Sequence, residues 1–226
     1  MNFPDQLLPP AILWVSALCA LPLLARAAVK APWRQLNQDN LLNVWLGMCV
    51  AVMVLWSIKT GVKPGLNFHL LGATLMTLMF GARLALVGLA IVLCGVTLAG
   101  HAGWSSFGIN LLLTAALPVF ASHLLFTLAD RKLPNHLFIY IFIDAFAGSA
   151  LAIVLTGATA SLVLAWSGVY GGSYLTANYL PYYILIGWSE AMMTGMVVTL
   201  MAAFRPQWLM TFDDDRYLRN KPRNDR

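Results

Sequence analysis

The sequence predicts an all-α integral membrane protein, a bundle of about seven transmembrane helices. Two observations support this class: 60% of the 226 residues are hydrophobic, and only 10% are charged. A soluble domain carries about 25% charged residues, so this chain has too few of them to cover a surface that faces water. The apolar residues also form long continuous runs, which favours helices over the alternating strands of a membrane β-barrel.

Seven apolar segments are candidates for the helices of this bundle. They cover residues 11–28, 41–58, 68–81, 84–98, 107–128, 137–166 and 179–204. The third has 14 residues, about 21 Å of helix against a hydrocarbon core of about 30 Å. We therefore expect it to begin inside the membrane, after the turn at Lys63-Pro64-Gly65 dips inward. The sixth segment is long enough to tilt, or to break near Gly157.

Non-helical backbone at membrane depth is tolerated only where protein buries it or where it lines a cavity. The entry to the third segment is therefore a candidate site. His69 lies there, and imidazole is the commonest transition-metal ligand. A lone intramembrane histidine can equally be a hydrogen-bonded structural residue, and both interpretations stay open. Asn67 is near enough in sequence to orient the ring.

The basic residues divide unequally between the two sets of connections. One set holds twelve: Arg26, Lys30, Arg34, Arg83, Arg131, Lys132, Arg205, Arg216, Arg219, Lys221, Arg223 and Arg226. The other set holds Lys59 and Lys63. Because cytoplasmic loops carry the excess of Lys and Arg, the N-terminus is predicted outside and the C-terminus in the cytoplasm. An odd number of spans agrees. The scattered charge and the lack of a nucleic-acid motif argue against nucleic acid as a partner.

The two ends of the chain have different predicted roles. The start has no basic region of a cleavable signal peptide, so we expect Met1 to remain and its amine to face outward. Such an amine has a pKa near 8, and a metal ion displaces its proton easily. The alternative is a disordered terminus. Residues 1–210 are predicted to form the bundle with this N-terminal segment, and residues 211–226 a polar cytoplasmic tail, with Asp213 in a solvated acidic run.

Two carboxylates, Glu190 and Asp144, fall near the middle of their predicted helices. Ionised carboxylates are expensive there, and a functional role and helix-helix anchoring remain equal alternatives. His101 follows the fourth segment on the outer side and is close enough to reach a metal. No catalytic motif of an ATPase or conventional hydrolase is present. The rival hypothesis is a metal-independent membrane protein, an intramembrane enzyme or assembly factor, that uses Glu190 and Asp144.

In four places, in the same order along the chain, the sequence resembles the CbiM/NikM family, the metal-binding membrane components of energy-coupling-factor transporters for cobalt and nickel. The start, Met-Asn-Phe-Pro-Asp-Gln, is similar to the family's Met-His-Ile-Pro-Asp-Gly. Pro64-Gly65 and His69-Leu-Leu-Gly-Ala-Thr match its Pro-Gly and His-Leu-x-Gly-Thr signature. The segment with Gly108 and Asn110 matches its Leu-Gly-Ala-Asn segment, and the last helix around Glu190 resembles its terminal Glu/Thr pattern.

The resemblance implies a nitrogen-rich metal site built from the Met1 amine, the backbone nitrogen and side chain of residue 2, and His69. Asn2 stands where the family has His, and Gln6 where it has Gly. A carboxamide is a weaker ligand than imidazole and favours harder cations, so the identity and affinity of the metal stay open. Around these ligands we expect four supporting or coupling residues: Asn67, His101, Asn110 and Glu190.

The resemblance also implies partners and a location. The substrate would be a divalent transition metal, nickel or cobalt, and the chain itself would not be an enzyme. A second membrane subunit and cytoplasmic ATPase subunits would supply the energy. The whole would reside in the lipid bilayer of a bacterial-type cytoplasmic (inner) membrane.

Overall fold

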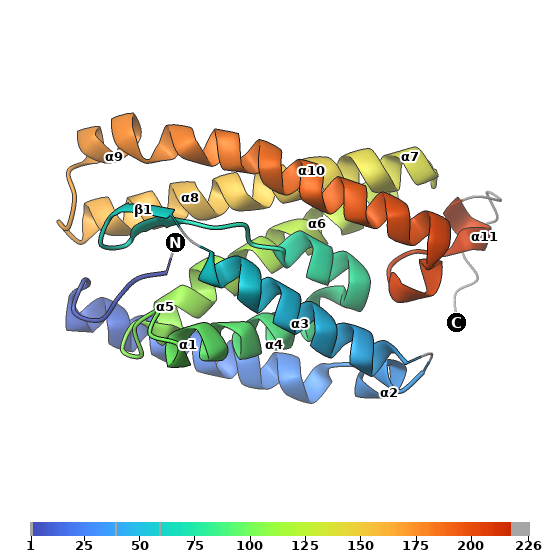
Figure 1. Cartoon of the computed structure of the whole chain (residues 1–226), viewed down its shortest axis with the longest axis horizontal. Coiled ribbons are helices and arrows are strands. Elements are labelled where there is room, and N and C mark those ends of the chain that lie inside the picture. Colours follow the sequence, from blue (N-terminus) through green and yellow to red (C-terminus); the bar gives the residue numbers. More distant parts are fainter. Residues whose placement is uncertain (1, 39, 59, 218–226) are drawn as a thin grey trace.

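The computed structural model describes residues 2–38, 40–58 and 60–217, and long helices dominate it (Figure 1). The N-terminal half holds α1 (Pro10–Lys30), α2 (Trp33–Leu36), α3 (Leu41–Ser57), β1 (Thr60–Lys63), β2 (Leu66–Phe68), α4 (Ala73–Leu98) and α5 (Phe107–Leu111). A π-helical turn, η1 (Leu112–Ala116), joins α5 to α6 (Leu117–Lys132). The rest comprises α7 (Leu137–Ile139), the π-helix η2 (Tyr140–Ala147), α8 (Gly148–Trp166), α9 (Gly172–Asn178), α10 (Leu180–Phe204), the 3-10 turn η3 (Pro206–Trp208) and α11 (Asp214–Tyr217).

The helical membrane fold is confirmed. Five helical stretches of the described chain are long and apolar enough to cross a bilayer: Pro10–Lys30, Ala73–Leu98, Phe107–Lys132, Leu137–Trp166 and Gly172–Phe204. The shorter apolar helix Leu41–Ser57 accompanies them. Large apolar side chains such as Trp14, Trp188 and Phe204 lie exposed on α1 and α10. A surface of this kind suits hydrocarbon and not water.

The third and fourth predicted segments form one element, α4, which breaks in its middle. Gly81 has φ 76° and ψ 162° and interrupts the helix, a conformation that glycine adopts without the steric cost of a Cβ. Ala73–Phe80 is therefore a half-length helix, about 12 Å long, and we call it the half-helix. The predicted start at Phe68 was wrong, because Phe68 ends a strand and the helix begins only at Ala73.

Of the two alternatives for the sixth predicted segment, the break near Gly157 was wrong, because α8 runs through this residue without interruption. The Tyr183 ring packs against the space where a side chain would be, and a Cβ on Gly157 would lie 2.2 Å from it. The irregularity lies earlier instead, in the π-helix η2. Asp144 lies within η2 and is buried. The glycine therefore permits close packing with α10 and does not hinge the helix.

A feature that an all-helical prediction omits is the antiparallel hairpin of β1 and β2. Its turn is held by the α8–α9 connection, where the Tyr170 hydroxyl donates to the Pro64 carbonyl, and by α9, where Lys63 lies over the Tyr174 ring. Figure 1 shows β1 and α9 at one end of the bundle and α2 and α11 at the other. We call these the hairpin end and the C-terminal end. The direction of this axis across a membrane stays a prediction.

Candidate metal-binding site

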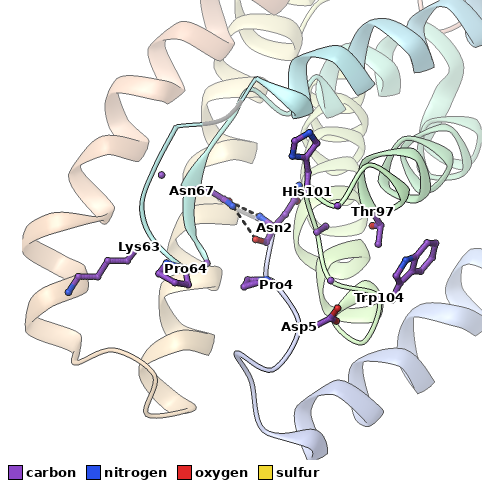
Figure 2. Close-up of a pocket in the computed structure, with 14 residues that line it drawn as sticks. Asn2, Pro4, Asp5, Lys63, Pro64, Asn67, Thr97, His101 and Trp104 are labelled. Atoms are coloured by element: carbon purple, nitrogen blue, oxygen red, sulfur yellow. Dashed lines mark hydrogen bonds between the residues drawn. The ribbon is translucent and has the colours of Figure 1, made fainter.

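At the hairpin end, two asparagine side chains hold the N-terminal segment inside the bundle. Asn2 donates its backbone N–H to Asn67 Oδ1 at 2.9 Å, and Asn67 Nδ2 donates back to the Asn2 carbonyl at 3.2 Å (Figure 2). One residue on, Phe3 makes the same pair with Asn110, at 2.7 and 3.0 Å. Each carboxamide thus pairs with both the N–H and the C=O of one residue, as the main chain of a neighbouring strand would. The N-terminal segment is therefore folded back into the bundle from Asn2 onward.

The loop between α4 and α5 encloses this segment from the other side. Gly103 donates its N–H to the Phe3 carbonyl at 3.1 Å, and a Cβ on Gly103 would lie 2.4 Å from the Asp5 nitrogen. The Asp5 carboxylate accepts from the backbone N–H of Ser105 at 2.8 Å and from its hydroxyl. These hydrogen bonds, the hydroxyl's first, lower the pKa of Asp5. Sequence reasoning missed Ser105, because an Asp–Ser pair 100 residues apart carries no local signal.

Gln6 is one of the two residues at which the start of the chain departs from the family pattern. Its φ is 64°, in the left-handed region that glycine enters freely and that costs other residues energy. The turn that leads from the buried segment into α1 therefore carries a side chain at a position where glycine would be unstrained.

A cavity of about 800 Å³ opens above the segment at the hairpin end, and Figure 2 shows the side chains that line it. Asn2, Asn67 and His101 contribute to its wall, together with Asp5 and Thr97. Asn2 is 1% exposed, and within the described part of the chain neither its Oδ1 nor its Nδ2 has a hydrogen-bond partner. A buried carboxamide normally has hydrogen-bond partners. Both polar atoms of this side chain are therefore available to a ligand in the cavity.

His69 is buried as well, at 4% exposure, but lines a different cavity. That cavity, about 430 Å³, lies between α3 and α10 and is lined in part by Leu55 and Ile186. The Trp56 ring lies 5.0 Å from the imidazole, centre to centre, and Nδ1 lies 3.0 Å from the Leu70 carbonyl. In the tautomer that makes Nδ1 the donor, Nε2 carries the lone pair suited to a metal.

The structure thus brings Asn2, Asn67 and His101 to one cavity and places His69 two residues beyond Asn67. Met1 lies outside the described residues. No group of three or more His, Cys, Asp or Glu side chains gathers at a metal-like spacing among the residues that the structure describes. Carried over to this chain, the ligand set implied by the family contains only one such side chain, His69, and draws otherwise on the Met1 amine and on the backbone nitrogen and side chain of Asn2.

Glu190 holds the main chain just before the half-helix. It is 1% exposed, and its two carboxylate oxygens accept the backbone N–H groups of Leu71 and Gly72 at 2.8 and 2.7 Å. These are the residues just before the half-helix, where unsatisfied N–H groups and the helix dipole favour an anion. Glu190 therefore fixes the segment that directly follows His69. Asp144 makes no such contact, and its Oδ1 has no partner within the described chain.

The fold and the buried N-terminal segment together define a multi-pass membrane protein of a recognisable class. The family described as "Cobalt uptake substrate-specific transmembrane region", CbiM, matches residues 2–208. The chain belongs to this family of membrane components for transition-metal uptake. The resemblance seen in the sequence is confirmed.

Individual proteins agree with this assignment. A curated relative, "Putative cobalt transport protein CbiM 2" of Methanosphaerula palustris, is 27% identical over 208 residues, which cover 89% of this chain and 85% of the relative. A crystal structure of a truncated transition metal transporter matches with a TM-score of 0.75 at 19% identity, over 90% of this chain and 99% of its own. A second transition metal transporter structure gives a TM-score of 0.74 at 20% identity, over 90% and 93%. At these identities the structures support the fold alone.

Proposed function

We propose that this chain captures a divalent transition metal, Co²⁺ or Ni²⁺, as the substrate-binding membrane subunit of an importer. The observation that carries the proposal is the buried Asn2 carboxamide, which has no hydrogen-bond partner among the described residues and lies beside a main chain held by Asn67 and Asn110. Family membership supports a transport role for the whole chain. The metal is the cargo of the protein and not a resident cofactor.

The proposed ligands are the Met1 amine, the backbone nitrogen and side chain of Asn2, and His69. Met1 lies outside the described residues, and its part rests on the family pattern. Without metal, the Asn2 N–H donates to Asn67, so a metal that binds this nitrogen must displace both the proton and the hydrogen bond. Because binding then releases protons, the affinity should rise with pH.

The surrounding residues have proposed tasks that follow from their contacts. Asn67 and Asn110 align the main chain of residues 2 and 3, and Glu190 fixes the residues that follow His69. His101 lines the outer cavity and is proposed to receive the ion on its way in. None of these four needs to bind the metal directly, since their role is to hold or feed the ligands.

The proposal extends to topology and partners. The N-terminus lies outside, residues 1–210 form the bundle and residues 211–226 face the cytoplasm of a bacterial-type inner membrane. A second membrane subunit and cytoplasmic ATPases energise uptake, and the twelve basic residues on the inner side offer them a docking face. The split of Lys and Arg, twelve in one set of connections and two in the other, supports this orientation, because cytoplasmic loops carry the excess of positive charge.

An uptake experiment tests the proposal. Cells that lack their own importer are given this chain, with an unmodified N-terminus, alone or with the coupling membrane subunit and ATPase subunits of a cobalt or nickel importer. We expect cobalt or nickel to accumulate only with the partners, and His69→Ala to abolish accumulation. His136→Ala, a histidine at the start of α7, serves as the matched control and should leave uptake unchanged. Equal accumulation by His69→Ala and the wild type would refute the proposed site.

A further inference from the structure

A second cavity lies away from the metal site, in the wall of the bundle. It has a volume of about 440 Å³ and lies between α1, α4 and α6, next to the break at Gly81. Its lining consists of Leu23, Arg26, Ala27, Ala82, Arg83, Leu86, Leu112, Ala116, Leu117, Val119, Phe120 and His123. We call it the α1–α4–α6 groove. None of the residues assigned to metal binding contributes to it.

The lining divides into two chemical parts. Nine of its twelve residues are apolar, and the other three, Arg26, Arg83 and His123, are basic. Each basic residue comes from a different helix, so no local sequence repeat accounts for their meeting. Among the described residues that line the groove, none is acidic. The two guanidinium groups therefore have no carboxylate within the groove to neutralise them.

The depth of the two arginines fits the edge of a bilayer. Arg26 lies four residues before the end of α1 at Lys30, or about 6 Å along the axis. Arg83 donates from its guanidinium to the Lys30 carbonyl at 2.8 Å, which places it at the same helix end. Long basic side chains at such an end reach the headgroup level. The apolar lining extends from there along α4 and η1, where Leu86 and Ala116 lie.

We propose that the α1–α4–α6 groove binds an anionic phospholipid. The phosphate of the headgroup pairs with Arg26 and Arg83, His123 adds a third donor, and one acyl chain lies against the apolar wall around Leu86 and Phe120. Basic pockets between membrane helices recognise anionic headgroups in this way. Charge complementarity favours an anionic lipid over two other occupants. The two guanidinium groups would repel the transported cation, and a purely apolar helix would leave them without a counter-charge.

Lipid retention measures the proposal directly. The full chain is purified in a mild detergent and mixed with dioleoyl phosphatidylglycerol or, separately, with neutral dioleoyl phosphatidylcholine. Native mass spectrometry counts the lipids retained, and thermal unfolding measures the stabilisation. We expect phosphatidylglycerol to be retained and to raise the melting temperature, and phosphatidylcholine to do neither.

Matched variants make the result specific to the groove. The double variant Arg26→Gln/Arg83→Gln should lose phosphatidylglycerol affinity by roughly tenfold or more, since each basic residue near the surface contributes separately. Arg34→Gln/Arg131→Gln carries the same loss of charge outside the groove and should retain the lipid. Ala116→Trp fills the groove and keeps every charge, so it should also lose the lipid, and it remains informative if the arginine variants do not fold.

Three results would overturn the proposal. They are equal retention of phosphatidylglycerol by the groove variants and the wild type, equal retention of both lipids by the wild type, and cross-linking of residue 116 to a co-expressed membrane subunit in place of lipid. The inference does not rest on metal binding, because every assay is run without metal. A failure of one proposal therefore leaves the other standing.

Discussion

The two ends of the half-helix satisfy their backbone groups by different means. Toward the hairpin end, a buried carboxylate, Glu190, accepts the N–H groups of Leu71 and Gly72. Toward the C-terminal end, the break at Gly81 ends the helix, and neutral donors satisfy its last carbonyl groups. Met210 donates its N–H to the Met79 carbonyl at 2.8 Å, and Thr211 donates its hydroxyl to the Leu78 carbonyl at 2.6 Å.

The difference follows from the dipole of the helix. Its N-terminal end favours a negative charge, and its C-terminal end accepts neutral donors without a charge to desolvate. Because Thr211 uses its only hydroxyl hydrogen on Leu78, Tyr140 must donate to Thr211 across their 2.8 Å contact. A half-length helix inside a bilayer thus needs partners at both ends. Here α10 and the segment after it supply both.

Loss of the charged partner should have the largest effect on stability. Glu190→Ala leaves two buried N–H groups without acceptors, and each such group costs about 1–3 kcal/mol. We expect a loss of about 2–5 kcal/mol in the free energy of unfolding, measured by denaturant titration in detergent. Ser189→Ala, on the exposed face of the same turn, is the control and should change little. A Glu190→Ala protein as stable as the control would contradict the account of this end.

Loss of the neutral partner should matter less. Thr211→Val keeps the shape of the side chain and removes the hydroxyl that joins Leu78 to Tyr140. We expect a loss of about 1–2 kcal/mol, the net value of one or two neutral hydrogen bonds, in the same titration. The order of the two variants is the sharper test. If Thr211→Val costs more than Glu190→Ala, the charged end does not dominate.

Gln6→Gly should stabilise the hairpin end. The residue has a φ of 64°, and glycine adopts it without the strain of about 1 kcal/mol that a side chain brings there. We expect a gain of about 0.5–1 kcal/mol, reduced from the full strain by the greater freedom of glycine in the unfolded chain. Gln6→Ala keeps the Cβ and should give no gain. A destabilised Gln6→Gly variant would mean that the glutamine side chain makes a contact worth more than the strain.

The smallest effect is a dependence of stability on pH at the cavity of the hairpin end. Hydrogen bonds from Ser105 lower the pKa of Asp5 below its ordinary 3.8. A lowered pKa means that the stabilisation is fully present above the unfolded value and is lost as pH falls through the folded value. We expect a small fall in melting temperature below about pH 4 that Asp5→Asn lacks. Because Asp5 is exposed, the effect is weak, and an identical pH profile in Asp5→Asn would exclude it.

The sequence predicted the helices well because long apolar runs in a bilayer leave few alternatives. It also predicted that Asn67 and His69 belong to one functional segment, since a short third segment needs non-helical backbone before it. The sequence did not predict the β1–β2 hairpin, because its strands are only four and three residues long. The boundary between the third and fourth predicted segments falls at the break at Gly81, where the third predicted segment ends.

Contacts between distant residues account for the rest of what the sequence could not give. Glu190 meets Leu71 across 119 residues, and Asn110 meets Phe3 across 107. Buried polarity marked Glu190 as important, but its role as an acceptor at a helix start required the fold. The C-terminal tail was expected to be a solvated polar segment. In its described part, Tyr217 is buried and stacks on Phe212, because aromatic residues within the tail pack on Tyr140.

Metal titration of four purified proteins tests the central claim most directly. These are the wild type, Asn2→His, His69→Ala and a form extended by one residue before Met1, with a form extended after Arg226 as the matched control. We expect Asn2→His to bind Ni²⁺ or Co²⁺ markedly more tightly than the wild type, because an imidazole replaces a carboxamide. His69→Ala should not bind, and the N-terminal extension should impair binding where the C-terminal one does not. Equal binding by the wild type, Asn2→His and the N-terminally extended form would contradict a site built on the start of the chain.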